Sequence, residues 1–302
     1  MSITSVEELF QNTSGACEVV QHLSENPNAH TQAARDFLME YWPIFKPYAD
    51  TEFLSEMQRN LHQRFWEMYL TCSMLIADKS VESADSGPDI KVITDSTPIW
   101  IEAIAVTPGQ EGQQDTVQDH ISDPLNGECR ARYVPDRQIS LRYTSALYSK
   151  YNLKYLEQYR VNETVAENEP YLIAINGGSI PLAKLERGIP RIVQVLFGMG
   201  HEVVTIDTEI MGIVDTRHEH RPLIYKINSS SVCSSWFSKP ENKYLSAVIF
   251  STVDIFNQPP RLGEDLLIVH NPNAVNPVPH GFLGRGREFV ADEEKVWEVI
   301  NE

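Results

Sequence analysis

Cysteine is scarce in this chain, and its four cysteines form no pattern typical of a cross-linked or metal-bound protein. Cys17, Cys72, Cys129 and Cys233 lie far apart in 302 residues, with no CxxC pair among them. A disulfide framework or a cysteine zinc site needs regularly spaced or paired cysteines. We therefore expect free thiols.

The chain also lacks a long apolar run and a leader-like start. No stretch approaches the roughly 20 consecutive apolar residues of a membrane-spanning helix. The opening MSITSVEELFQNTSGACEVV has neither the basic nor the apolar region of a secretory signal. With 42 % hydrophobic residues, the sequence predicts a cytoplasmic protein with a large buried core and no membrane partner.

Basic residues are outnumbered. Lys and Arg total 25 against 42 Asp and Glu, which gives a formal net charge of -17. Such a charge opposes non-specific attraction to a polyanion, because phosphate binding draws mainly on clustered Lys and Arg. A nucleic-acid partner is therefore expected only through a local basic patch.

The first half of the chain alternates helical and strand-like patterns. Residues 52–77 place apolar side chains at intervals of three to four, which predicts an amphipathic helix that packs on a sheet. Residues 89–93 and 99–106 are β-rich runs around the turn-like TDSTP and predict a hairpin. A helix over 140–159 and a buried strand over 170–176 follow, an order typical of an α/β core.

The two ends add to this core. Residues 5–48 predict helical pieces broken at Pro27 and Pro43. Past the core, five segments predict strands that extend the sheet, and the tail EEKVWEVI predicts a short closing helix. The five segments are PRIVQVLFGMG, HEVVTIDTEI, PLIYKI, KYLSAVIFST and DLLIVHNPNAV. We divide the chain into a helical cap (1–51), an α/β core (52–200) and a C-terminal extension packed on the core (201–302), together one structural unit.

Two acids in the predicted hairpin are unexpected in strands built for burial. Glu102 shares a strand face with Trp100 and Ile104 and has apolar neighbours in sequence on both sides. An ionised carboxylate there needs a metal, a cation or hydrogen-bond donors. Asp89, at the start of the partner strand, can meet it across the hairpin. A divalent cation would relieve the repulsion between two such carboxylates.

The segment Pro88-Asp89, twelve residues, then Glu102-Ala103-Ile104 resembles the PD-(D/E)xK motif of the restriction-endonuclease-like superfamily. The likeness covers residues 52–176, with a helix before the motif and a helix and strand after it. It implies a mixed central sheet flanked by helices. It also implies Mg²⁺ or Mn²⁺ bound by Asp89 and Glu102, with help from the backbone carbonyl after the glutamate, and hydrolysis of a DNA or RNA phosphodiester. A homodimer is possible by the same analogy.

The sequence departs from this motif at the lysine, whose place is taken by Ile104. Some members of the superfamily carry the lysine on a neighbouring element. Lys150 and Lys154, one turn apart on the predicted helix, and Lys91, on the strand of Asp89, are the candidates. We rank Lys150 first because its helical neighbours are mostly apolar, and a lysine in that place needs a buried acidic partner.

Two further points concern the elements before the hairpin. Some members of the superfamily supply an acid from the first helix to the metal, and Glu67 falls near the apolar face of the predicted helix. The alternative for Glu67 is a surface ion pair with Arg64. Residues 78–86 leave little room for the strand that normally precedes the aspartate, so that strand is expected to be short or missing.

Other functions remain open at this stage. The missing in-line lysine and the acidic charge also fit a catalytically inactive nuclease fold that serves as a binding or interaction module, with the acids as structural ion-pair partners. Hydrolysis of a small phosphorylated substrate is a third alternative. His218 and His220 could face zinc together, although no third ligand is nearby and a solvated loop is favoured. Arg142 could clamp a phosphate or form a salt bridge.

Overall fold

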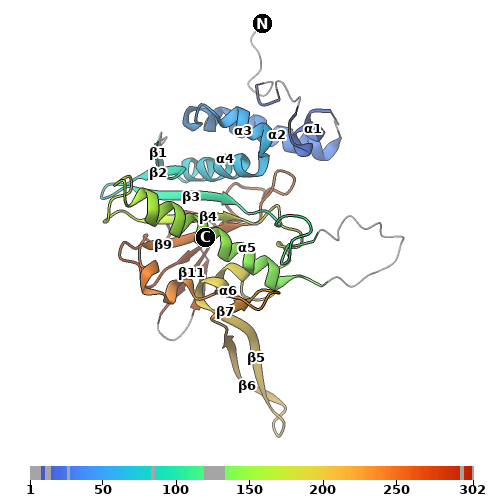
Figure 1. Cartoon of the computed structure of the whole chain (residues 1–302), viewed down its shortest axis with the longest axis vertical. Coiled ribbons are helices and arrows are strands. Elements are labelled where there is room, and N and C mark those ends of the chain that lie inside the picture. The colour runs from blue at the N-terminus through green and yellow to red at the C-terminus, as the bar shows by residue number, and fades with distance from the viewer. Residues whose placement is uncertain are drawn as a thin grey trace.

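A mixed eight-stranded sheet forms the centre of the protein (Figure 1). The computed structural model describes residues 8–10, 15–25, 28–82, 86–118, 133–292 and 296–300. The spatial order of the strands is β1-β2-β3-β4-β9-β10-β11-β12. Their bounds are β1 Ser80–Glu82, β2 Ile90–Ile93, β3 Ile99–Ala105, β4 Tyr171–Asn176, β9 Leu245–Ser251, β10 Leu267–His270, β11 Arg287–Ala291 and β12 Val296–Ile300.

Helices cover both faces of this sheet (Figure 1). The N-terminal helices lie on one face, and the helices from the middle of the chain lie on the other. The first group is α1 Glu18–Glu25, α2 Ala29–Phe45, α3 Phe53–Arg59 and α4 Leu61–Ile76. The second is α5 Asp136–Tyr148, continued by the π-helix η2 Ser149–Tyr159, and α6 Arg191–Phe197. The protein is therefore a mixed α/β fold with a large sheet between helices.

Strand β4 shows why the sheet is buried on both sides. All six of its residues are buried. Leu172 and Ala174 belong to the apolar core beneath α4, whereas Ile173 and Ile175 belong to the core beneath α5. A strand covered on both faces reads as a continuous apolar run rather than as an alternating one. The prediction of a buried strand at 170–176 is confirmed.

The predicted helix at 52–77 is present but broken. It forms α3 and α4, separated at Asn60, whose side-chain oxygen accepts a hydrogen bond from the backbone N–H of Gln63 at 3.4 Å. An Asn at this position satisfies a free N–H of the first turn and favours a new helix start. The predicted break at Pro43 is wrong, because Pro43 lies inside α2, where its neighbours Trp42 and Phe45 are buried. Pro27 lies outside the described residues.

Four predictions for the C-terminal half are wrong. PRIVQVLFGMG contains a helix, α6, which ends at Gly198 with a left-handed φ of 67°. Its β-branched residues resemble a strand pattern, but they pack on α5 and η3 Trp236–Ser238. The tail is the strand β12, antiparallel to β11, because a free sheet edge offers backbone partners that a short helix lacks.

The third correction concerns the long ribbon in the middle of the chain. β5 Met199–Asp207 and β6 Gly212–His220 are strands, but they pair only with each other and do not extend the main sheet. This hairpin projects from the body (Figure 1). The fourth correction is PLIYKI, whose strand β7 Leu223–Tyr225 pairs with β8 Ser231–Cys233 in a second separate sheet and does not extend the main one. The predicted extension by β9 and β10 is confirmed.

Three of the four cysteines lie within the described residues. Cys17, Cys72 and Cys233 are free, and Cys129 lies outside the described residues. Within the described ranges, none of the helices is both long and apolar enough to span a bilayer.

Candidate functional site

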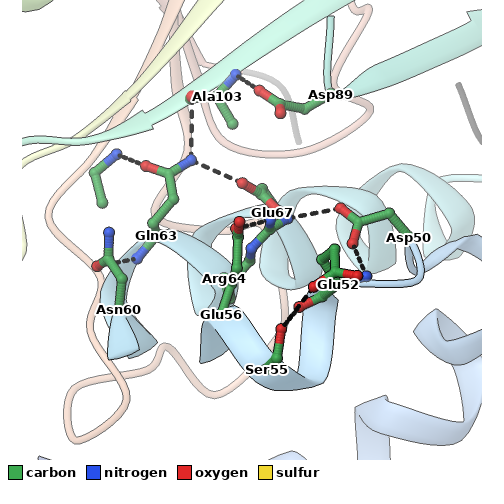
Figure 2. Close-up of polar contacts among 11 residues, drawn as sticks. Asp50, Glu52, Ser55, Glu56, Asn60, Gln63, Arg64, Glu67, Asp89 and Ala103 are labelled. Carbon is green, nitrogen blue, oxygen red and sulfur yellow. Dashed lines mark hydrogen bonds and ion pairs between the residues drawn. The ribbon is translucent and has the colours of Figure 1, made fainter. Parts of the chain in front are cut away.

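The candidate site lies where β2 and β3 part. The last pair between them is Ile90 with Ile101, yet β3 continues to Ala105. Beyond Ile101, β3 therefore has backbone groups that β2 does not pair. Buried backbone groups need partners, and here two side chains supply them. Asp89 Oδ2 accepts a hydrogen bond from the N–H of Ala103 at 2.6 Å, and Gln63 pairs with the carbonyl of Ala103 and the N–H of Ala105 (Figure 2).

Gln63 of α4 takes the place of a neighbouring strand. Its Nε2 donates to the carbonyl of Ala103 at 3.2 Å, and its Oε1 accepts from the N–H of Ala105 at 2.8 Å. The same Nε2 donates to Glu67 Oε1 at 2.8 Å (Figure 2). Gln63 thus links α4, which also carries Glu67, to β3, the strand of Glu102.

Glu67 is both buried and paired with Arg64. The sequence had offered these two features, an inward-facing acid and an ion pair with Arg64, as alternatives. It is 8 % exposed, and its Oε2 lies 2.6 Å from Arg64 Nη1. Arg64 is shared with Asp50 and Glu56 (Figure 2). Burial raises the pKa of Glu67, and Arg64 and Gln63 oppose that rise.

Glu102 is held by two side chains from the π-helix. It is 1 % exposed. Its Oε1 lies 2.5 Å from Lys150 Nζ, and its Oε2 accepts from the hydroxyl of Tyr159 at 2.9 Å. Lys150 therefore has the buried acidic partner that its helix position calls for. Burial, followed by the charge of Glu102, raises the pKa of Tyr159, so this hydroxyl stays a donor.

The π-helix is what allows both contacts. Lys150 and Tyr159 are nine residues apart, which is about two and a half turns of an α-helix, so α-geometry would put them on opposite sides. A helix bonded from residue i to i+5 has wider turns, and nine residues make about two of them. The side chains then share a face. Tyr171 of β4 donates to the carbonyl of Lys150 at 3.1 Å and holds this turn against the sheet.

The surroundings of Asp89 disfavour the charged form of its carboxyl group. Burial among protein atoms, and then the charges of Glu102 and Glu67, raise the pKa of Asp89 to about 8. Lys150 and the Ala103 N–H act in the opposite direction. Part of the residue remains exposed, so water reaches it and screens some of this repulsion. In the absence of a cation, the carboxyl therefore tends to keep a proton.

This raised pKa predicts a pH-dependent effect of Asp89→Asn. An ordinary aspartate has a pKa of about 3.9 in the unfolded chain, so the folded wild type holds an extra proton between about pH 4 and about pH 8. Its free energy of unfolding must fall across that window as pH rises. Asn does not titrate. The variant should match the wild type near pH 4 and gain relative stability up to about pH 8.

Urea unfolding in chelator at several pH values measures this difference. Asp95→Asn, in the exposed turn of the same hairpin, controls for the loss of one negative charge. A stability difference between Asp89→Asn and wild type that stays constant from pH 4 to pH 8 would show that the carboxyl is not strained.

The remaining candidate residues lie elsewhere or have other partners. Lys91 pairs with Glu82 at 3.0 Å, and Lys154 Nζ lies over the ring of Tyr159 at 5.9 Å. Arg142 donates to the carbonyl of Thr107 at 2.8 Å. His218 contacts the carbonyl of Gly200 at 3.3 Å on the projecting hairpin. None of these four brings a charge to the Asp89–Glu102 cluster.

Gln63 and Tyr159 are contributors that the sequence reasoning missed. A glutamine on the first helix carries no charge and gives no spacing signal. Tyr159 is one of five tyrosines in the helix predicted at 140–159, a pattern that indicates core packing, and the rings of Tyr151 and Tyr155 do stack at 5.4 Å. The strand overhang that needs Gln63, and the π-helix that turns Tyr159 inward, exist only in three dimensions.

The cluster carries more negative than positive charge, and a bound cation could balance the difference. If all are ionised, five carboxylates face two cations, a net charge of -3. The carboxylates are those of Asp50, Glu56, Glu67, Asp89 and Glu102, and the cations are Arg64 and Lys150. Asp89 Oδ1 takes no hydrogen bond in the described part of the chain. Carboxylate oxygens are the ligands that Mg²⁺ and Mn²⁺ prefer, so the residues fit such an ion.

Comparisons of the chain with models of known protein families, with curated proteins and with solved structures find no match.

Proposed function

We propose that this protein is a metal-dependent phosphodiester hydrolase of the nuclease type, built on a PD-(D/E)xK core. The observation that carries the proposal is the meeting of Lys150 with Glu102, next to Asp89, at the point where β2 and β3 diverge. The element order supports it. A helix (α4), the antiparallel strands β1 to β3, a helical crossover and the parallel strand β4 follow one another as the resemblance implies. β1 has three residues, in keeping with the short space before Asp89.

In this proposal Asp89 and Glu102 hold the ion, and Glu67 contributes through Gln63 or directly. A bound Mg²⁺ or Mn²⁺ would lower the pKa of a coordinated water and neutralise charge that develops on the phosphodiester. Asp89 must first lose its proton, so metal affinity should rise with pH up to about 8. Gln63 occupies the carbonyl of Ala103, the one that the resemblance gives as a further ligand.

Lys150 would orient the attacking water. Its ammonium group lies at Glu102 and can donate up to three hydrogen bonds, so one can serve Glu102 while another holds a water. Tyr159 keeps Glu102 in place through its other oxygen. The substrate class is DNA or RNA, which the net charge of -17 confines to a local basic surface.

The inactive binding module is a second candidate, and a specific observation favours it. Both oxygens of Glu102 and both oxygens of Glu67 already have partners within the protein. A closed network of this kind stabilises a fold without any ion. The two candidates differ in one measurable property, which is the affinity of the cluster for a divalent cation.

Calorimetric titration of Mn²⁺ into the wild type, Asp89→Asn and Glu102→Gln tests the proposal. The polar shape of each side chain is kept, so loss of binding in both variants with an unchanged circular dichroism spectrum would support the site. Glu82→Gln, an exposed acid on β1, is the matched control and should bind like wild type. Binding would justify a screen of DNA and RNA substrates. No binding to the wild type, even with an oligonucleotide present, would contradict the proposal and favour the binding module.

A further inference from the structure

A second group of possible metal ligands lies away from the Asp89–Glu102 cluster. His270 ends β10, His280 lies in the loop that follows, and Glu288 is on β11. Across the described ranges, this is the group of three His, Cys, Asp or Glu side chains whose ligand atoms all lie within 4.8 Å of one another. The sequence reasoning had considered His218 and His220 instead.

Two members of this group are buried, and one of them has a polar atom without a hydrogen-bond partner among the described residues. Glu288 is 1 % exposed and His270 is 8 % exposed. His270 Nε2 is buried and takes part in no hydrogen bond within the described residues. An unsatisfied buried donor or acceptor costs free energy, and this one is directed toward Glu288 Oε2, 3.4 Å away.

Two of the three separations within the group match those between ligands of one ion, and all three are within 4.8 Å. Glu288 Oε2 lies 3.4 Å from His270 Nε2 and 3.6 Å from His280 Nδ1. Both separations exceed the usual 2.7–3.2 Å of a hydrogen bond. Zinc binds nitrogen and oxygen at about 2.0–2.2 Å in tetrahedral geometry, which sets two ligands about 3.4 Å apart.

Neighbouring contacts hold the ligands in place. The other oxygen of Glu288 accepts from the N–H of Gly281 at 2.7 Å, next to His280. This bond fixes Glu288 and the loop together and leaves Oε2 facing the two imidazoles. The rings of His270 and His280 are 4.8 Å apart, tilted by 52°. Carboxylate ligands of metal sites are usually held in place by a hydrogen bond of this kind.

We propose that His270, His280 and Glu288 form a site for a single Zn²⁺ ion, distinct from the Asp89–Glu102 cluster. Two imidazoles and one carboxylate select zinc over Mg²⁺ and Mn²⁺, which prefer oxygen ligands. Three protein ligands leave a fourth position for water, on the side of His280, which is 73 % exposed. The ion would fasten the loop between β10 and β11 to the sheet.

Glu102 and the two strand residues of the proposed zinc site point to opposite faces of the sheet. Glu102 is in register, through β4 and β9, with Val269 of β10. Cross-strand partners share a face, and the next residue points the other way. His270 therefore faces away from the side of Glu102, as does Glu288, which pairs with Ile268. β10 is three strands from β3, about 14 Å, so one ion does not serve both groups.

Titration of Zn²⁺ into the full chain, in competition with a chromophoric chelator, tests this site. His280→Ala is the informative variant because its exposed side chain can be removed without a cavity. It should weaken Zn²⁺ binding by more than about 100-fold, beyond the 10–100-fold effect of an outer-sphere partner. His218→Ala, on the projecting hairpin, is the matched control and should bind Zn²⁺ like wild type.

Two further measurements separate this inference from the proposed nuclease. Glu102→Gln should retain full Zn²⁺ affinity, and millimolar Mg²⁺ should not displace the zinc. Zn²⁺ should also raise the melting temperature of wild type and Glu102→Gln but not of His280→Ala. Equal Zn²⁺ affinity in wild type and His280→Ala would overturn the proposal, as would loss of binding in Glu102→Gln.

Discussion

Replacing Lys150 by methionine is expected to lower the free energy of unfolding by about 3–5 kcal/mol, the usual result of removing one partner of a buried ion pair. The reason is Glu102, which is 1 % exposed and would keep only the hydroxyl of Tyr159. Methionine retains the length and apolar stem of lysine, so the loss reports the charge. Urea unfolding in chelator measures it.

Lys154→Met is the matched control. Lys154 lies one turn further along the π-helix, and its ammonium group lies 5.9 Å from the ring centre of Tyr159 and forms no ion pair with the described residues, so its replacement should cost less than about 1 kcal/mol. The double variant Lys150→Met/Glu102→Gln should recover most of the lost stability, since no unpaired buried charge remains. Equal losses for the two lysines would contradict the buried ion pair.

The same variant also bears on the proposed metal. Lys150 lies at Oε1 of Glu102 and would compete with a cation for that oxygen. If the proposed site binds Mn²⁺, Lys150→Met should bind it more tightly than wild type while hydrolysing any substrate more slowly. Mn²⁺ should restore part of its lost stability by binding only the folded state. A fall in both Mn²⁺ affinity and hydrolysis would instead make Lys150 a contributor to the ligand geometry.

Trp66→Ala is expected to cost about 3–5 kcal/mol, as large-to-small replacements of buried aromatic residues do. Trp66 is fully buried, stacks on Tyr69 at 6.0 Å, and donates from Nε1 to the carbonyl of Ala174 at 2.9 Å. It thus joins α4 to the middle of the sheet. Because Gln63 and Glu67 are on the same helix, loosening α4 should also weaken Mn²⁺ binding.

Two further variants separate the loss of ring packing from the loss of the hydrogen bond to Ala174. Trp66→Phe keeps most of the ring but leaves the Ala174 carbonyl without its donor, which should cost about 1–3 kcal/mol. Trp297→Ala removes a tryptophan that is 38 % exposed on the edge strand β12, and should cost less than either. Circular dichroism during urea unfolding gives all three values. A loss for Trp297→Ala as large as for Trp66→Ala would show that α4 does not anchor the sheet.

The local spacing of apolar residues was sufficient to predict most of the central sheet and the helix that precedes it. β4 is an almost continuous apolar run, β3 is apolar except at Glu102, and α4 has apolar side chains at helical spacing, so each was predicted from its own residues. Pattern failed at α6 and β12. A seven-residue segment rich in Ile and Val does not show whether it meets a sheet edge or a helix face, because burial by neighbours outweighs its propensity.

The apolar pattern around Glu102 singled out this acid and Asp89, because charged residues within apolar patterns need partners whatever the fold. The resemblance to the PD-(D/E)xK motif added Lys150 and Glu67 as candidates. The sequence by itself therefore determined these four charged residues, but not Asp50 and Glu56, which pair with Arg64. Only the tertiary structure decided which lysine meets Glu102. The π-helix turns Lys150 and Tyr159 to one face, and the overhang of β3 beyond β2 creates the unpaired backbone that Gln63 and Asp89 satisfy. Strand length and helix winding are set by packing across the whole sheet, which no single segment encodes.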